Sequence, residues 1–301
     1  METLMSDFLF FVEVLLSGLL TGSLYSLVAL GFVLIFKASG VFNFAQGAMM
    51  LFAALSMVGI QEALGIHWTL AFVITVAVMV GVAWCIEKFV LGKLVNQEPI
   101  ILFMATIGVT FFLDGFGQTI WGSDIRVMDI GLPDGVFDVG GVFIDQLELV
   151  AGATAAGLVI VLAVFFNKTK IGRALRAVAD DHQAAMSVGI SLRYIWIVVW
   201  SVAGLVGLVA GIMWGSKLGV QFSLSLIALK ALPVLMLGGF TSIPGAIIGG
   251  LIIGSGEKLA EIYLGPFVGG AIENWFAYML ALVFLLFRPQ GLFGEKIIER
   301  V

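Results

Sequence analysis

Six apolar blocks of about membrane-spanning length constrain the fold of this chain more than any other feature. A helix needs about 20 apolar residues to cross the hydrocarbon core of a bilayer. Only 12% of the 301 residues are charged, whereas soluble domains carry roughly 25%, so the chain cannot cover itself with a water-facing surface. We therefore predict a polytopic integral membrane protein. The blocks are residues 8–36, 68–86, 100–120, 149–166, 194–214 and 267–287.

The spans are predicted to be helices. Lipid offers no partner to backbone N–H and C=O groups, so only helices and closed barrels cross a membrane. Apolar and polar residues do not alternate in these blocks, as they would in barrel strands. The first block is longer than the apolar part of a signal peptide and follows the acidic Glu2 and Asp7. We therefore predict that it is the first span of an all-α fold.

The basic residues predict an orientation, because lysine and arginine gather in short cytoplasmic loops. The segment 167–193, the loop near 88–98 and the C-terminus are rich in both and are placed inside. The acidic segment 122–148 is placed outside, and the parity of the spans then puts the N-terminus outside. The basic residues used are Lys88, Lys93, Lys168, Lys170, Arg173, Arg176, Arg193, Arg288, Lys296 and Arg300.

The segment 225–262 is predicted to be a re-entrant pair of half-helices. Its apolar halves, 226–237 and 246–255, are too short to span separately, and the sequence GGFTSIPG at 238–245 favours a turn between them. Irregular backbone at membrane depth is tolerated where it is buried in protein or lines a wet cavity, and broken helices often form transport sites. A kink used only for packing is the alternative. We predict about eight membrane segments, namely seven full spans and this pair.

Polar residues inside apolar runs are candidates for a translocation pathway. Asn43 and Gln46 are three residues apart and are predicted to share a helical face, where paired amides would join helices or line a path; joining helices is favoured. Lys230 lies in the re-entrant run, where an ionisable residue suggests function, although its side chain could instead reach the outer interface. The candidate pathway residues are Asn43, Gln46, Lys230, Gly238, Gly239, Ser242, Pro244 and Gly245.

The inside segment 167–193 contains a predicted amphipathic helix over residues 173–188. Its alanine-rich composition favours a helix, and Gly189 can end that helix. A short helix at the cytoplasmic face is either a docking element for a partner or part of a solvated loop whose charges fix the topology. The residues by themselves leave both interpretations open.

Several functional classes lack their motifs in this sequence. There is no G-x-x-x-x-G-K-[S/T] to bind ATP, no H-E-x-x-H, no G-x-S-x-G and no Cys/His cluster, and Cys85 is the single cysteine. We therefore expect no catalytic site, metal site or cofactor in this chain. The net charge of −5 argues against a nucleic-acid partner. A stand-alone secondary transporter or channel and an intramembrane enzyme are alternatives, disfavoured because deep carboxylates and catalytic groups are scarce.

Four strings of this sequence form ordered motifs. Residues 18–54 carry G-x-x-x-G-x-x-Y-x-L-x-A-x-G followed by N-F-A-x-G, and residues 183–189 read Q-A-A-x-x-x-G. The third string is L-K-A with L-G-G-x-x-S-I-P-G-A-x-x-G-G within 229–254, and the fourth is F-R-P-Q-G-L-F-G at 287–294. Together the strings resemble the LivH-type permeases of branched-chain amino acid ABC importers. In that family residues 171–190 correspond to a cytoplasmic coupling loop with the pattern E-A-A-x-x-x-G, and Gln183 stands in place of the usual glutamate.

The resemblance implies one permease domain over residues 1–301, forming half of a translocation pathway in a prokaryotic cell membrane. The expected substrates are leucine, isoleucine and valine or related amino acids; urea and amides are alternatives within the family. The expected partners are a LivM-like permease, two LivG/LivF-like ATPases that use ATP, and an extracytoplasmic binding protein. The residues expected to couple the permease to the ATPases are Gly172, Arg173, Arg176, Ala184, Ala185 and Gly189.

Overall fold

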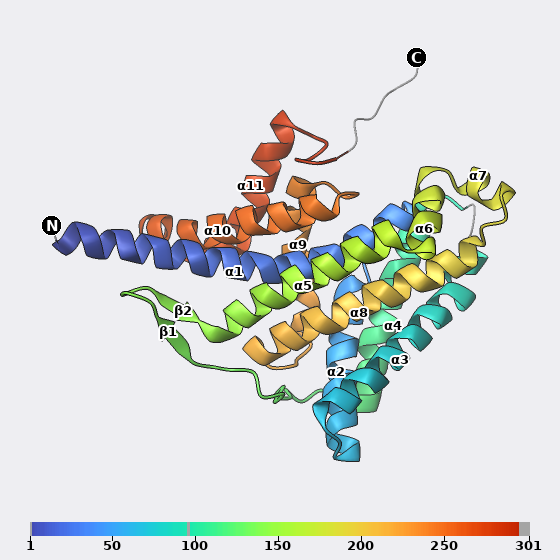
Figure 1. Cartoon of the computed structure of the whole chain (residues 1–301), viewed down its shortest axis with the longest axis horizontal. Helices are drawn as coiled ribbons and strands as arrows, with labels where there is room; N and C mark the ends of the chain where they lie inside the picture. The colour runs from blue at the N-terminus through green and yellow to red at the C-terminus, as the bar shows by residue number, and fades with distance from the viewer. Residues whose placement is uncertain (1, 95–96, 295–301) are drawn as a thin grey trace. The chain divides into compact units, whose positions relative to one another are not determined.

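The computed structural model describes residues 2–94 and 97–294, which are mostly helical (Figure 1). A short 3-10 helix (Leu91–Lys93) follows the third long helix. The α-helices of the described residues are α1 (Glu2–Ser39), α2 (Gln46–Leu64), α3 (Trp68–Phe89), α4 (Pro99–Trp121), α5 (Gln146–Lys168), α6 (Lys170–Asp180), α7 (His182–Ser187), α8 (Leu192–Leu218), α9 (Leu224–Gly238), α10 (Ile243–Val268) and α11 (Glu273–Phe287).

The all-α membrane fold is confirmed. Within the described residues, seven helices are long and apolar enough to cross a membrane, namely α1 to α5, α8 and α10. The acidic segment 122–148 contains a small antiparallel hairpin of β1 (Val136–Asp138) and β2 (Phe143–Asp145). The orientation of the termini stays a prediction, and Lys296 and Arg300, on which the inside C-terminus partly rests, lie outside the described residues.

The break at 238–245 is confirmed, but the lengths predicted around it are wrong. Helix α9 ends at Gly238 after 15 residues, whereas α10 runs for 26 residues instead of ending near residue 255. The predicted span 267–287 is interrupted, because α10 ends at Val268 and α11 has only 15 residues. Helix α10 continues past the charged Glu257 because that side chain is buried in an ion pair, so its charge does not mark the end of the span.

The described chain forms two compact units. The first draws on residues within 1–29, 131–157 and 229–301, and the second on residues within 30–130 and 158–228. In the first unit, α1 packs closely on α10 through glycines: a Cβ added to Gly18 would lie 2.7 Å from the Ser255 Cα, and one added to Gly254 would overlap the backbone at Gly22. Side chains cannot fit between the helix backbones at this crossing.

Helix α2 forms the core of the second unit. Every residue from Gln46 to Ile60 is buried, and α3, α4 and α8 all contact this helix. Glycines on α8 allow the close approach: a Cβ on Gly211 would lie 2.8 Å from the Met50 carbonyl oxygen. Small residues at four-residue spacing therefore serve helix packing in both units, as the sequence indicates.

Candidate translocation and coupling sites

A buried ion pair joins α9 and α10 in the first unit. The Lys230 ammonium donates to the Glu257 Oε1 atom at 2.9 Å, and the Tyr25 hydroxyl donates to the same oxygen at 3.3 Å. Glu257 is 2% exposed, whereas the Lys230 side chain is 28% exposed. The cluster ties three helices, α1, α9 and α10, around one carboxylate. Lys230 is thus held at a fixed position with part of its side chain still accessible.

The second carboxylate oxygen of Glu257 lacks a hydrogen-bond partner among the described residues. A buried oxygen without a donor costs about 1–3 kcal/mol, more when it is charged, and natural proteins retain few such atoms. Uncompensated polar groups at membrane depth are typical of functional sites. Glu257 and Tyr25 were absent from the predicted site. A lysine in an apolar run needs an acidic partner, and Glu257 is an acidic residue in the following apolar segment, so this requirement could have suggested it.

The predicted residues of the helix break lie together. The Gly238 and Gly245 backbones approach so closely that a Cβ on either would overlap the other, and Ser242 Oγ accepts from the Gly245 N–H at 3.1 Å. Pro244 occupies the first turn of α10, where a missing N–H is harmless. Gly239 has a φ of 102°, which side-chain-bearing residues rarely adopt. The break is therefore a tight, specified turn.

The C-terminal string F-R-P-Q-G-L-F-G closes this turn. The Leu292 N–H donates to the Leu237 carbonyl at 2.7 Å, and the Phe293 N–H donates to the Gly238 carbonyl at 3.1 Å. These bonds satisfy carbonyl groups at the end of α9, which have no partner within the helix. Two strings more than 40 residues apart in the sequence thus form one structural element, because one supplies the hydrogen bonds that the other leaves open.

The structure brings Asn43 and Gln46 together, but the prediction that they share a helical face is wrong. Helix α1 ends at Ser39 and α2 begins at Gln46, so Asn43 lies in the connection between them. Its Oδ1 accepts from the Ala45 N–H at 3.1 Å, which explains why the helix starts after it. Gln46 Nε2 donates to the Ala203 carbonyl of α8 at 3.3 Å, and both amides are fully buried. Gln46 therefore joins helices, as favoured from the sequence.

The predicted coupling helix over 173–188 is two helices, α6 and α7. Asp181 interrupts it because its backbone is extended and its Oδ1 accepts from the N–H groups of Gln183 and Ala184, starting a new helix. Gly189 follows α7 with a φ of 86° and donates its N–H to the Met186 carbonyl, so its predicted role as a terminator is confirmed.

The predicted coupling residues divide into packed and exposed groups. A Cβ on Gly172 would overlap the Phe166 backbone, so α6 packs directly against the end of α5. Arg176 donates to the Phe166 carbonyl at 2.7 Å. Ala185 is buried, whereas Arg173, Ala184 and Gly189 are exposed. The exposed residues form the part of this segment that a partner can contact.

A second buried acid lies beside α7 and was missed in the sequence. Glu87, near the end of α3, is 2% exposed and accepts from the Arg193 Nε at 2.9 Å. A surface pocket of about 400 Å³ is lined by Glu87, Arg193 and Met186, among others. The ion pair thus joins α3 to the start of α8. Met186 of α7 lines the same pocket, so α7 lies next to both. The sequence carried a signal, because Glu87 directly follows the apolar block 68–86 and Arg193 directly precedes the block 194–214.

The fold and these sites define a class of protein: a polytopic helical membrane protein with a broken helix and a buried ion pair, as transporters have. A family model described as the branched-chain amino acid transport system / permease component matches residues 14–288. The chain belongs to this family.

Its curated relatives match over nearly their whole length. The chain is 29% identical to the high-affinity branched-chain amino acid transport system permease protein LivH of Escherichia coli, covering 98% of this chain and 99% of that protein. It is 27% identical to BraD of Pseudomonas aeruginosa, a permease of the same description, covering 99% and 100%. A solved complex of PsaBC from Streptococcus pneumoniae with a Fab aligns at a TM-score of 0.46 and 14% identity, covering 90% of this chain and 89% of that chain.

Proposed function

We propose that this chain is the permease subunit of an ATP-driven importer of branched-chain amino acids in a prokaryotic inner membrane. The observation that carries the proposal is the family match over residues 14–288, together with the nearly full-length similarity to permeases named for these substrates. The seven long apolar helices supply the membrane-spanning part. No chemical step on the substrate is needed in this chain.

The motor of the importer is proposed to lie on other subunits. The sequence has no P-loop, so ATP would be hydrolysed by two LivG/LivF-like ATPases at the cytoplasmic face. A LivM-like permease would supply the other half of the pathway, and an extracytoplasmic binding protein would deliver the substrate. In this arrangement α6 and α7 transmit ATPase closure to the bundle, and Lys230 and the turn at 238–245 belong to the pathway.

The proposed substrate is tested by uptake. Cells lacking their own branched-chain transport, given this chain with its proposed partner subunits, are expected to accumulate labelled leucine, isoleucine and valine, and ATP depletion is expected to stop accumulation. Labelled urea and a short amide serve as matched alternatives from the same family. Accumulation of urea or the amide without leucine would assign a different substrate to this permease. Uptake by this chain without any ATPase would overturn the proposal that it belongs to an ATP-driven importer.

Ala184 provides a test of coupling that leaves the fold intact. Its side chain is exposed on α7, so Ala184→Arg places a bulky charge on the docking surface without disturbing a core. We expect normal amounts of the variant in membranes, loss of the ATPases on purification, and uptake reduced about tenfold or more, the change that ~1.4 kcal/mol of lost docking energy produces.

Ala184→Ser is the matched control and is expected to keep both uptake and the bound ATPases. If Ala184→Arg co-purifies with its ATPases and takes up leucine at the normal rate, α7 is not the docking element. The segment would then be a solvated loop that fixes topology.

A further inference from the structure

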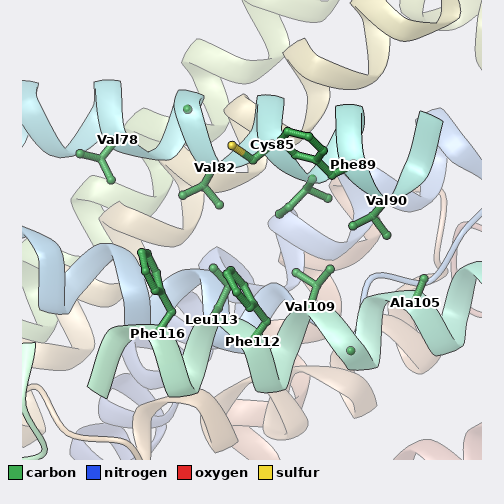
Figure 2. A pocket seen from close by; sticks show the side chains of 13 residues that line it. Val78, Val82, Cys85, Phe89, Val90, Ala105, Val109, Phe112, Leu113 and Phe116 are labelled. Atoms are coloured by element: carbon green, nitrogen blue, oxygen red, sulfur yellow. The ribbon is translucent and has the colours of Figure 1, made fainter. Parts of the chain in front are cut away.

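An apolar groove of about 760 Å³ lies between α3 and α4 in the second unit (Figure 2). Both helices pack on α2, and the buried Val109 and Leu113 are among the residues that line the groove. Phe112 and Phe116 also line it and are 65% and 43% exposed. Large exposed aromatic side chains around an apolar hollow need an apolar occupant.

Two glycines keep the groove open. Gly81 on α3 and Gly108 on α4 both line it, and a Cβ added to either would meet no other atom within 4 Å. They are therefore not needed for helix packing, unlike the glycines of α8 and α10. Their missing side chains leave room that leucine or phenylalanine would fill.

The length of the groove matches one leaflet of a bilayer. It extends from Val78 on α3 to Val90, the residue that follows this helix, which at ~1.5 Å per residue is about 18 Å. Half of a hydrocarbon core of ~30 Å is about 15 Å. The groove reaches the end of α3 that carries the basic residues, and it does not cover the other half of the span.

A cation lies beside that end, outside the lining of the groove itself. The Lys88 ammonium is 4.4 Å from the centroid of the Trp84 ring and 5.5 Å from that of Phe89, and Phe89 lines the groove. Lys93 follows in the short 3-10 helix after α3. The neighbouring acid, Glu87, already pairs with Arg193, so it does not neutralise Lys88.

We propose that this groove binds the acyl chains of an anionic phospholipid whose head group pairs with Lys88. A cavity of about 150 Å³ is enough to hold benzene, so the groove has room for the two chains of one lipid. A partner's spanning helix would require contact along the whole of α3, whereas the groove covers about half of that helix. The site rests on the membrane location of the chain and is independent of the substrate.

Photo-crosslinking tests the proposal in membranes containing the full-length chain. Phosphatidylglycerol with a diazirine in its acyl chain is expected to label peptides 78–90 and 105–116 preferentially, and more strongly than phosphatidylcholine with the same chains. Lys88→Gln should lower that preference about fivefold, the factor that corresponds to the contribution of one basic residue at an anionic surface. Gly108→Leu should remove most labelling of these peptides.

Gly115→Leu is the matched control, because Gly115 is also on α4 in open space but does not line the groove. A measurement without substitutions uses Cys85, the single cysteine, which lines the groove and is exposed. Phosphatidylglycerol should slow its alkylation in detergent several-fold, and phosphatidylcholine should not. Equal effects of both lipids would overturn the proposal, as would crosslinking from Cys85 to another protein subunit, which would assign the groove to a partner helix.

Discussion

Lys230→Met is expected to destabilise the permease and to abolish most of its uptake. The substitution leaves the Glu257 carboxylate buried with only the Tyr25 hydroxyl still donating to it among the bonds described above. Removing one partner of a buried pair costs about 3–5 kcal/mol because the remaining charge is uncompensated. The amount of protein in membranes, its melting temperature in detergent and leucine uptake should all fall.

The double variant Lys230→Met/Glu257→Gln separates stability from transport. It removes both charges, and replacing a buried pair by uncharged residues is often neutral, so protein amount and melting temperature should return close to normal. Uptake should stay about tenfold or more below normal if Lys230 belongs to the translocation pathway, as proposed. Recovery of uptake together with stability would instead make the pair purely structural.

Lys258→Met is the matched control for the loss of a lysine. Lys258 is on α10 next to Glu257, but its ammonium is 3.9 Å from Glu273, and both side chains are more than a third exposed. Such exposed pairs contribute about 0–1 kcal/mol. We therefore expect nearly normal protein amount and uptake; a loss as large as that of Lys230→Met would show that removal of any lysine here is harmful.

Gly254→Val is expected to separate α1 from α10 and to prevent assembly of the helices of the first unit. Even a Cβ at this position would overlap the Gly22 backbone and crowd the Gly18 carbonyl. Backbone atoms cannot move aside as a flexible side chain can, so the helices must shift. Overpacking of a close contact costs about 1–3 kcal/mol and sometimes more, and the shift would also disturb Tyr25 and Glu257, which join the same two helices.

Gly256 on the same helix supplies the control. A Cβ there would lie 3.4 Å from the Leu280 and Phe276 side chains, an ordinary contact. We expect Gly256→Ala to be neutral or slightly stabilising, since alanine favours a helix by up to about 1 kcal/mol over glycine, and Gly254→Ala to lower the melting temperature already. Equal melting temperatures for the two alanine variants would contradict the close crossing.

Local features of the sequence predicted much of the fold correctly. The spans α3, α4, α5 and α8 lie close to their predicted apolar blocks, because hydropathy sums over neighbouring residues and needs no knowledge of partners. The turn at 238–245 was predicted because glycine and proline act on their own backbone. The termination of α7 at Gly189 was predicted for the same reason.

The errors have two causes. One is a contact between residues distant in the sequence, and the other is a hydrogen bond from a nearby backbone N–H group to a side chain. Asn43 and Asp181 accept from nearby N–H groups and so interrupt predicted helices. Composition alone does not reveal this, because the same residues can also face solvent on a helix.

The sequence by itself determined that this chain spans a membrane as helices, where one helix breaks, and to which family it belongs, since each follows from local composition or from ordered strings of residues. Only the tertiary structure decided that α10 is a full-length helix and that Lys230 has a partner. The cost of placing Glu257 within an apolar helix depends on a cation 27 residues away in the chain. That cost changes once the fold brings the two charges within 2.9 Å, and hydropathy, which weighs each residue separately, cannot include it.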